Sequence, residues 1–293
     1  MGLQDMKNKL FHKVEEMNEP PEWEKVLAEE QEDMETAADE YQKEKENPDA
    51  VGLEESRKEA RNVDFPQTKL NLDATKEYAV IVDDVVKVFG EEQVLKHVSH
   101  AFERGKVHGI IGNNGSGKTV MLKCICGFMK PTTGRVLVHG KEIGKDVDFP
   151  DDIGIIIESP GFLPTKTGFR NLQILASLKG KIGREEIIRT IERVGLDPAL
   201  KKPVSKYSLG MRQRLGIAQA IMEDPDLLIL DEPFNGLDRY GVEDIRKIIQ
   251  DLKELNKTIL LVSHNGEDIR LLCDTVCEMD AGILREVYHD EEE

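Results

Sequence analysis

One stretch of eight residues decides the fold, and it reads Gly112-Asn113-Asn114-Gly115-Ser116-Gly117-Lys118-Thr119. It matches the P-loop pattern G-x-x-x-x-G-K-[ST], in which the glycines let successive backbone N–H groups turn toward one anion. The pattern assigns Lys118 to the β- and γ-phosphates of a nucleotide and the Thr119 hydroxyl to Mg²⁺. The alternative is a glycine-rich turn with an unrelated lysine.

The residues on either side of this loop support the first interpretation. A short apolar stretch, Lys106–Ile111, runs into the loop and is expected to be a strand. The loop is followed by residues 120–127, which are apolar nearly all round and predict a buried helix. A strand, a glycine loop and a buried helix in this order are the context that a P-loop requires.

Two unbroken apolar runs, Leu227–Leu230 and Thr258–Val262, predict parallel strands that are covered on both faces. The first run ends in Asp231-Glu232, and the end of such a strand faces the ligand at the edge of the sheet. We therefore predict that Asp231 holds Mg²⁺ and that Glu232 polarises an attacking water. Together with the P-loop, these runs predict an α/β fold of the P-loop NTPase (RecA-like) class.

The net charge of −17 comes from 57 acidic and 40 basic residues. Such a protein offers little attraction to a phosphate backbone, so we expect no nucleic-acid partner. No apolar run reaches the roughly 18–20 residues that span a bilayer, and no signal peptide is evident at the start. We therefore expect a cytosolic protein without direct membrane insertion, which reaches a membrane through a partner.

Four cysteines, at positions 124, 126, 273 and 277, have the spacings C-x-C and C-x₃-C. These spacings fit the common zinc motifs poorly, and no histidine pair accompanies them. Their neighbours are apolar, so we expect the cysteines to pack in the core as small apolar side chains.

Three further motifs follow in order, at Tyr207–Leu215, Asn235–Asp238 and His264. With these motifs, residues from about 78 to 286 resemble the nucleotide-binding subunit of an ATP-binding-cassette (ABC) transporter. The first motif stands in the place of the LSGGQ signature, and the second in the place of the D-loop. The resemblance implies a RecA-like mixed sheet, an antiparallel β subdomain and an inserted helical subdomain near residues 160–205.

The resemblance also implies roles for individual residues. Ser208 and Gly210 would contact the ATP held by a second cassette, Asp238 would belong to the D-loop, His264 would contact the γ-phosphate, and Phe89 would stack on adenine. Each has a plainer alternative: a helix start for Ser208-Leu209-Gly210, a turn or helix cap for Asp238, a polar strand end for His264 and a core strand residue for Phe89.

At two places the sequence differs from the usual family pattern, and both differences point to one branch of the family. The signature has Leu209 and Met211 where Gly and Gln are common, and Glu158 stands where most members have Gln. Both departures resemble single-cassette exporters related to bacitracin and lantibiotic self-protection. Glu158 is therefore expected to contact the metal or its water while adding a negative charge near the phosphates; a solvated loop acid is the alternative.

The charge distribution and the resemblance together give the expected domain organisation. Residues 1–75 carry 21 acidic and 10 basic side chains, a net charge of −11, and should form an acidic extension that is helical or disordered. The ATPase domain should span residues 76–286, followed by an acidic tail at 287–293.

The resemblance implies an ATPase subunit that uses ATP and Mg²⁺, pairs with a second cassette and drives export through a separate membrane permease on the inner face of the cell membrane. The alternative is a soluble ABC ATPase that acts on a non-transport assembly. A third alternative, a nucleotide-binding regulator without turnover, is disfavoured by the intact Asp231-Glu232 and His264.

Overall fold

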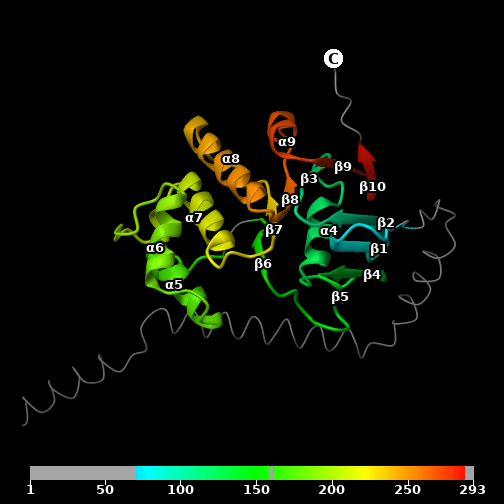
Figure 1. The fold of residues 1–293 in the computed structure, drawn as a ribbon, viewed down its shortest axis with the longest axis horizontal. Helices are drawn as coiled ribbons and strands as arrows, with labels where there is room; N and C mark the ends of the chain where they lie inside the picture. Colours follow the sequence, from blue (N-terminus) through cyan, green and yellow to red (C-terminus); the bar gives the residue numbers. More distant parts are fainter. Residues whose placement is uncertain (1–69, 71, 159–160, 288–293) are drawn as a thin grey trace, which may run out of the picture. The chain divides into compact units, whose positions relative to one another are not determined.

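The structure, a computed structural model, describes Leu70, residues 72–158 and residues 161–287 (Figure 1). The chain divides into two units, Met1–Val63 and Asp64–Glu293, and all described residues belong to the second. The acidic extension expected over residues 1–75 lies outside the described residues up to Lys69, and so does the expected tail from Tyr288 onward. None of the helices in the described part of the chain is long and apolar enough to cross a membrane.

The central element is a six-stranded sheet with the order β10-β9-β3-β8-β7-β6. Its strands are β3 (Val107–Ile111), β6 (Ile153–Ile156), β7 (Leu227–Asp231), β8 (Thr258–Val262), β9 (Thr275–Asp280) and β10 (Ile283–Val287). All pairs are parallel except the one between β9 and the edge strand β10. Every residue of β7 and β8 is buried, so the two apolar runs are parallel strands covered on both faces, as predicted.

A second, antiparallel sheet has the order β2-β1-β4-β5, and its strands are β1 (Tyr78–Phe89), β2 (Glu92–Glu103), β4 (Thr133–Val138) and β5 (Lys141–Glu142). β1 is one continuous strand, although its register with β2 is irregular between Val82 and Val85. Asp84, inside this irregularity, has a φ of 51°. This sheet is the antiparallel β subdomain that the resemblance implied.

The helices are α4 (Lys118–Ile125), α5 (Gly168–Lys179), α6 (Arg184–Arg193), α7 (Leu209–Ile221), α8 (Arg239–Glu254) and α9 (Gly266–Leu272). One apolar core joins α4 and the antiparallel sheet to one face of β7 and β8, through residues such as Leu227 and Leu260. A second core joins α5, α6, α7 and α8 to the opposite face, through Leu228 and Leu261. The sheet thus separates the P-loop helix from a helical group that is clearly set apart in Figure 1.

The cysteines pack as expected. Three of them, Cys124, Cys126 and Cys277, are buried; Cys273 is partly buried, and all four are free thiols. Burial raises the pKa of the Cys126 and Cys277 thiols to about 12, so both stay protonated at neutral pH.

Candidate nucleotide-binding and catalytic site

The P-loop connects β3 to α4, and its shape depends on three glycines with positive φ. Gly112, Gly115 and Gly117 have φ values of 140°, 78° and 110°. A Cβ at Gly112 would collide with the carbonyl oxygen of Met279 on β9, so no larger residue fits there. The P-loop backbone at Gly112 therefore packs directly against the backbone of β9.

Lys118 is buried and folds back over the loop. Its Nζ donates to the carbonyl oxygens of Gly112, at 2.7 Å, and Asn113, at 2.9 Å. The ammonium group is thus held at the centre of the loop by two neutral acceptors, and both can be exchanged for phosphate oxygens. Its contact with the β- and γ-phosphates stays a prediction.

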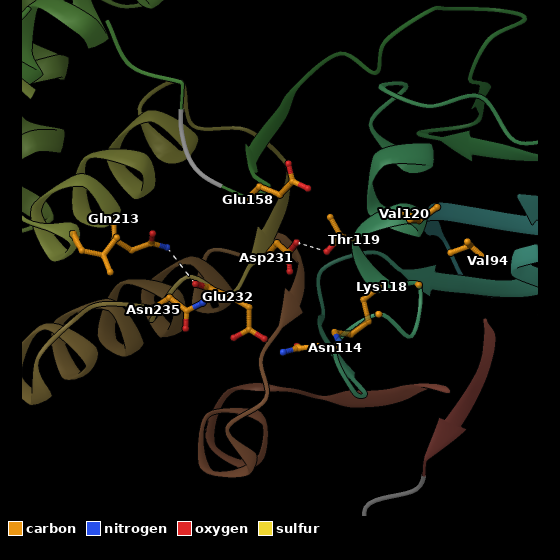
Figure 2. Close-up of a pocket in the computed structure, with 13 residues that line it drawn as sticks. Val94, Asn114, Lys118, Thr119, Val120, Glu158, Gln213, Asp231, Glu232 and Asn235 are labelled. Atoms are coloured by element: carbon orange, nitrogen blue, oxygen red, sulfur yellow. Dashed lines mark hydrogen bonds between the residues drawn. The ribbon is translucent and has the colours of Figure 1, made fainter. Parts of the chain in front are cut away.

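Thr119 and Asp231 meet at the carboxyl end of β7. The Thr119 hydroxyl donates to Asp231 Oδ2 at 2.9 Å, as Figure 2 shows. Burial raises the pKa of the Asp231 carboxyl, and the hydrogen bond from Thr119 opposes this effect only in part. A buried carboxylate beside a hydroxyl is a set of hard oxygen donors, which suits Mg²⁺. These residues therefore fit the metal that the sequence predicts.

Glu232 follows Asp231 in a conformation that is unusual for a residue with a side chain, with a φ of 50°. Its N–H donates to the Val262 carbonyl at 3.0 Å. Its carboxylate Oε2 lies 2.8 Å from Nδ1 of His264, which follows β8. The structure therefore brings together the two residues predicted to act on the attacking water and the γ-phosphate.

Gln213, on α7, is a residue that the sequence analysis missed. Its side chain is buried, and Nε2 donates to the Glu232 carbonyl oxygen at 3.2 Å (Figure 2). The same carbonyl accepts from the Asn235 N–H. These bonds hold the strained backbone of Glu232 from two sides. A sequence signal existed, because Gln213 is a polar residue in line with the buried Gly216, Ile217 and Ala220 on one face of the helix.

Glu158 lies just after β6, with a φ of 58°. Its carboxylate Oε1 forms an ion pair with Nζ of Lys123 on α4, at 2.8 Å. The negative charge that the sequence predicts at this place is therefore present, but a neighbouring cation balances it. The sequence analysis did not identify Lys123.

A cavity of about 590 Å³ joins these groups, and a cavity of this volume is within the usual range of ligand sites. The P-loop contributes more lining residues than any other segment, and Glu158, Asp231 and Glu232 contribute carboxylates. Figure 2 shows these side chains around the P-loop, together with Val94 of β2. The remaining lining includes Leu209, Gln213 and Asn235.

Ser208, Gly210 and Asp238 do not line this cavity. Ser208 is the N-cap of α7, where its hydroxyl accepts from the Met211 N–H at 3.2 Å. Asp238 is the N-cap of α8, accepting from the Gly241 N–H at 2.7 Å. Gly210 packs against the D-loop, since a Cβ there would lie 2.8 Å from the Gly236 carbonyl oxygen. Both caps agree with the plainer alternatives, and neither excludes a contact with a second chain.

Phe89 is the last residue of β1, and 44% of it is exposed, so the alternative of a core strand residue is wrong. Its ring is covered on one side by Lys87, whose Nζ lies 4.9 Å from the ring centroid. Phe89 is not among the residues that line the cavity. Its role with adenine therefore stays a prediction.

Comparison with known proteins places this geometry in a family. A family model described as ABC transporter matches residues 95–235. The chain is 43% identical over 201 residues to the uncharacterized ABC transporter ATP-binding protein YybJ of Bacillus subtilis (strain 168), covering 69% of this chain and 92% of that protein. It is 40% identical over 212 residues to the bacitracin transport ATP-binding protein BcrA of Enterococcus faecalis, covering 72% and 69%. The lantibiotic transport ATP-binding protein SrtF of Streptococcus pyogenes is 35% identical over 196 residues, covering 67% and 84%.

Solved structures show the same fold. The dimeric structure of a post-hydrolysis state of the ATP-binding cassette MJ0796, bound to ADP and Pi, superposes with a TM-score of 0.64 at 26% identity. The match covers 71% of this chain and 97% of that one. Since a P-loop and a carboxylate pair line one cavity, with His264 beside Glu232, in a chain that so closely matches these relatives, the protein belongs to the ATP-binding subunits of ABC transporters, which hydrolyse ATP to drive transport.

Proposed function

We propose that this chain hydrolyses MgATP between two cassettes and thereby drives export through a separate membrane permease. The observation that carries the proposal is the contact of Thr119 with Asp231 and of Glu232 with His264 at neighbouring strand ends. In this proposal the P-loop and Lys118 bind the phosphates. Mg²⁺, held by Thr119, Asp231 and Glu158, would neutralise phosphate charge when bound.

Glu232 is the residue we propose to orient the attacking water. Its carboxylate is fixed by the backbone of β7 and by His264, so it needs little reorganisation to accept a proton. His264 is placed to contact the γ-phosphate and to set the direction of the Glu232 carboxylate. Because Glu232 lines the cavity and His264 contacts its carboxylate, while the P-loop binds the phosphates, loss of either side chain should affect hydrolysis more than nucleotide binding.

The second cassette is proposed because one half of the site faces away from this chain's own cavity. Ser208 caps α7, so the backbone N–H groups at the start of that helix form a favourable anion site. Ser208 and Gly210 do not line the cavity of their own P-loop. A second copy or a related subunit, with its ATP against Ser208 and Gly210, would complete both sites, and the dimeric form of MJ0796 supports this arrangement.

The permease contact is proposed near Glu158, between the sheet and the helical group. Phe128 follows α4 and Phe149 precedes β6, the two elements that Lys123 and Glu158 join. Both aromatic side chains are more than half exposed, and their ring centroids are 6.2 Å apart. An exposed aromatic pair is suited to an apolar segment of a partner protein. Such a partner would hold the subunit at the cytoplasmic face of the membrane.

Export and a peptide-antibiotic cargo are supported by the relatives named for bacitracin and lantibiotic transport, and by the residues Glu158, Leu209 and Met211. The soluble, non-transport alternative is not favoured, because these relatives are ATP-binding proteins of transporters. The net charge of −17 also argues against nucleic acid as a partner.

Two measurements on the full chain test the proposal. Glu232→Gln should bind ATP and accumulate as a dimer when ATP is added, with hydrolysis lowered by about a hundredfold or more, because the water loses its carboxylate. Near-normal turnover would contradict the role of Glu232. Purification from native membranes should recover a polytopic membrane protein with the chain; recovery of a soluble assembly instead would favour the alternative.

A further inference from the structure

The ion pair between Lys123 and Glu158 joins the P-loop helix to the end of β6. Their charged atoms, Nζ and Oε1, are 2.8 Å apart, and the side chains are 27% and 61% exposed. Lys123 lies four residues after Thr119 on α4, so the two side chains share one face of the helix. Glu158 lines the same cavity as Thr119 and Asp231. The pair therefore stands directly beside the proposed phosphate and metal positions.

We propose that Lys123 is a positioning residue that allows a glutamate to work at this place. It neutralises the charge of Glu158 and holds the carboxylate at the edge of the cavity. The pair of Lys123 and Glu158 then has no net charge, like the glutamine that most family members have at the position of Glu158. The inference rests on the proposed binding of the nucleotide in this cavity.

The charges around the cavity explain why a cation is needed there. Asp231 and Glu232 already contribute two carboxylates to the cavity wall, and ATP brings several more negative charges. Lys118 is engaged with the loop carbonyls of Gly112 and Asn113, so Lys123 is the lysine that contacts Glu158 in the described part of the chain. Without it, Glu158 would repel the phosphates across a short, partly screened distance.

The backbone also favours a positioning role. Glu158 has a left-handed φ of 58°, which fixes the direction in which its side chain leaves the strand. A long, flexible carboxylate that is more than half exposed would otherwise sample several rotamers. The Lys123 ammonium selects the one that lies against α4. An isolated exposed ion pair contributes little to stability, so its effect should appear in ligand binding and not in unfolding.

A double-mutant cycle on the full chain tests this inference. We would compare wild type, Lys123→Met, Glu158→Gln and the double variant, measuring ATP binding in EDTA by calorimetry and then KM and kcat with Mg²⁺. Lys123→Met should weaken metal-free ATP binding and raise KM by about threefold to tenfold, because the Glu158 charge is then unbalanced. Glu158→Gln in that background should restore metal-free ATP binding to within about twofold of wild type, because no charge is left to balance.

The controls separate charge from folding. Lys123→Arg keeps the charge and should bind ATP like the wild type. Lys145→Met removes an exposed lysine that pairs with Glu142 at 3.1 Å and lies outside the cavity lining, and it should change neither value. Unchanged ATP binding in Lys123→Met, or an equal loss in the double variant, would overturn the inference. If the wild type itself failed to bind ATP, the proposed function would fail instead.

Discussion

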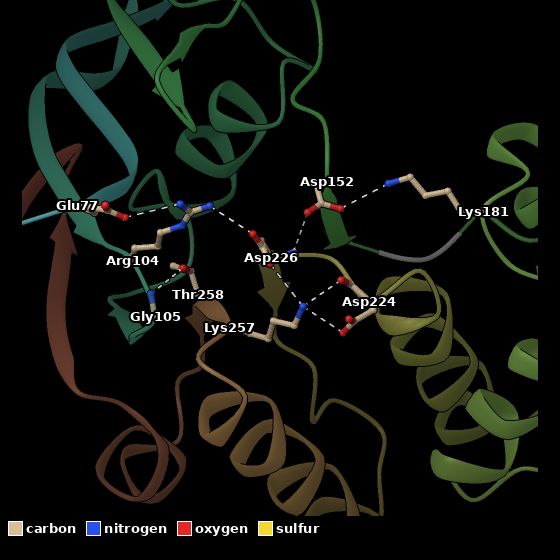
Figure 3. Close-up of polar contacts among 9 residues, drawn as sticks. All are labelled: Glu77, Arg104, Gly105, Asp152, Lys181, Asp224, Asp226, Lys257 and Thr258. Atoms are coloured by element: carbon tan, nitrogen blue, oxygen red, sulfur yellow. Dashed lines mark hydrogen bonds and ion pairs between the residues drawn. The ribbon is translucent and has the colours of Figure 1, made fainter.

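Charged residues lie at both ends of the strands of the six-stranded sheet. We call the side where β7 and β8 end the first edge and the side where they begin the second edge, and the charged residues have different roles at the two. Asp231, Glu232 and His264 lie at the carboxyl ends of β7 and β8, and Figure 2 shows Asp231 and Glu232 beside the cavity. At the other edge, where these strands begin, Asp226 and Lys257 belong to a network of ion pairs (Figure 3). At the first edge the carboxylates are available to a ligand, whereas at the second edge they are paired with cationic side chains of the same chain.

The ion-pair network at the second edge is dense. Arg104 Nη2 lies 3.3 Å from Asp226, and Lys257 Nζ lies 3.1 Å from Asp224 and 3.5 Å from Asp226. Asp152, just before β6, pairs at 3.5 Å with Lys181, which lies between α5 and α6. Each of these carboxylates has a cation beside it.

Asp231, at the opposite edge, has only the Thr119 hydroxyl and no ion-pair partner among the described residues. Among the described residues, the Thr119 hydrogen bond and the charge of Lys118 offset its burial only in part. Such a group costs stability and is ready for an external cation, whereas a paired group contributes to holding the domain together. The comparison leads to four predictions, in which changes at the first edge should lower turnover and changes at the second should lower stability.

The largest effect should come from Asp231→Asn. An amide binds Mg²⁺ more weakly than a carboxylate, so kcat should fall by about 10²- to 10³-fold, the range seen when one electrostatic stabiliser is removed. The domain should not lose stability, because the change removes a buried charge. Steady-state kinetics at several Mg²⁺ concentrations and thermal unfolding would measure both quantities. A loss of less than about threefold in kcat would contradict the metal role.

Gln213→Leu should have the next effect. The substitution removes the donor to the Glu232 carbonyl while keeping similar bulk, so the strained backbone at Glu232 loses one support. We expect kcat to fall about tenfold, with KM for ATP changed less than about twofold, because the water-orienting group is displaced and the P-loop is not. Gln213→Glu should have the same effect, because an ionised carboxylate cannot donate a hydrogen bond to the Glu232 carbonyl. Equal losses in kcat and nucleotide affinity would indicate general damage to the fold.

Lys257→Met should lower stability without changing KM. Lys257 Nζ donates to the Asp224 carbonyl oxygen at 3.0 Å and pairs with two carboxylates, and its side chain is nearly buried. Its loss should cost about 1–3 kcal/mol of unfolding free energy, because a nearly buried ammonium loses its hydrogen bond and its ion pairs with the exposed Asp224 and Asp226. Urea unfolding gives this value. If Lys257→Met lowered kcat while its unfolding free energy stayed at the wild-type value, the two edges would not be separate in function.

Lys181→Met should have the smallest effect. The pair with Asp152 is 3.5 Å long and about half exposed on both sides. Exposed pairs of this kind contribute about 0–1 kcal/mol, so the free energy of unfolding should stay within about 0.5 kcal/mol of wild type. Comparison with Lys257→Met separates the buried part of the network from its exposed rim. A loss as large as that of Lys257→Met would mean that this contact holds the helical group to the core.

Much of the architecture could be predicted from local patterns. The apolar runs at β7 and β8 are parallel strands as predicted, and the strand before and helix after the P-loop are where the sequence placed them. Helix starts were less accurate. α4 begins at Lys118, two residues before the predicted stretch 120–127, and α7 and α8 begin directly after their N-caps, Ser208 and Asp238. Cap hydrogen bonds decide these boundaries, and apolar periodicity does not show them.

Local patterns in the sequence were enough to identify the chemistry of single loops and strand ends. The P-loop, Asp231-Glu232 and His264 could be identified because their backbone geometry and residue types are set within a few consecutive positions. The distant groups that support these residues could be found only from the fold. Gln213 reaches Glu232, Lys123 reaches Glu158 and Lys257 reaches Asp224 across 19, 35 and 33 positions of the chain. Such contacts depend on how helices and strands pack, and a charge or an amide in one sequence does not reveal its partner.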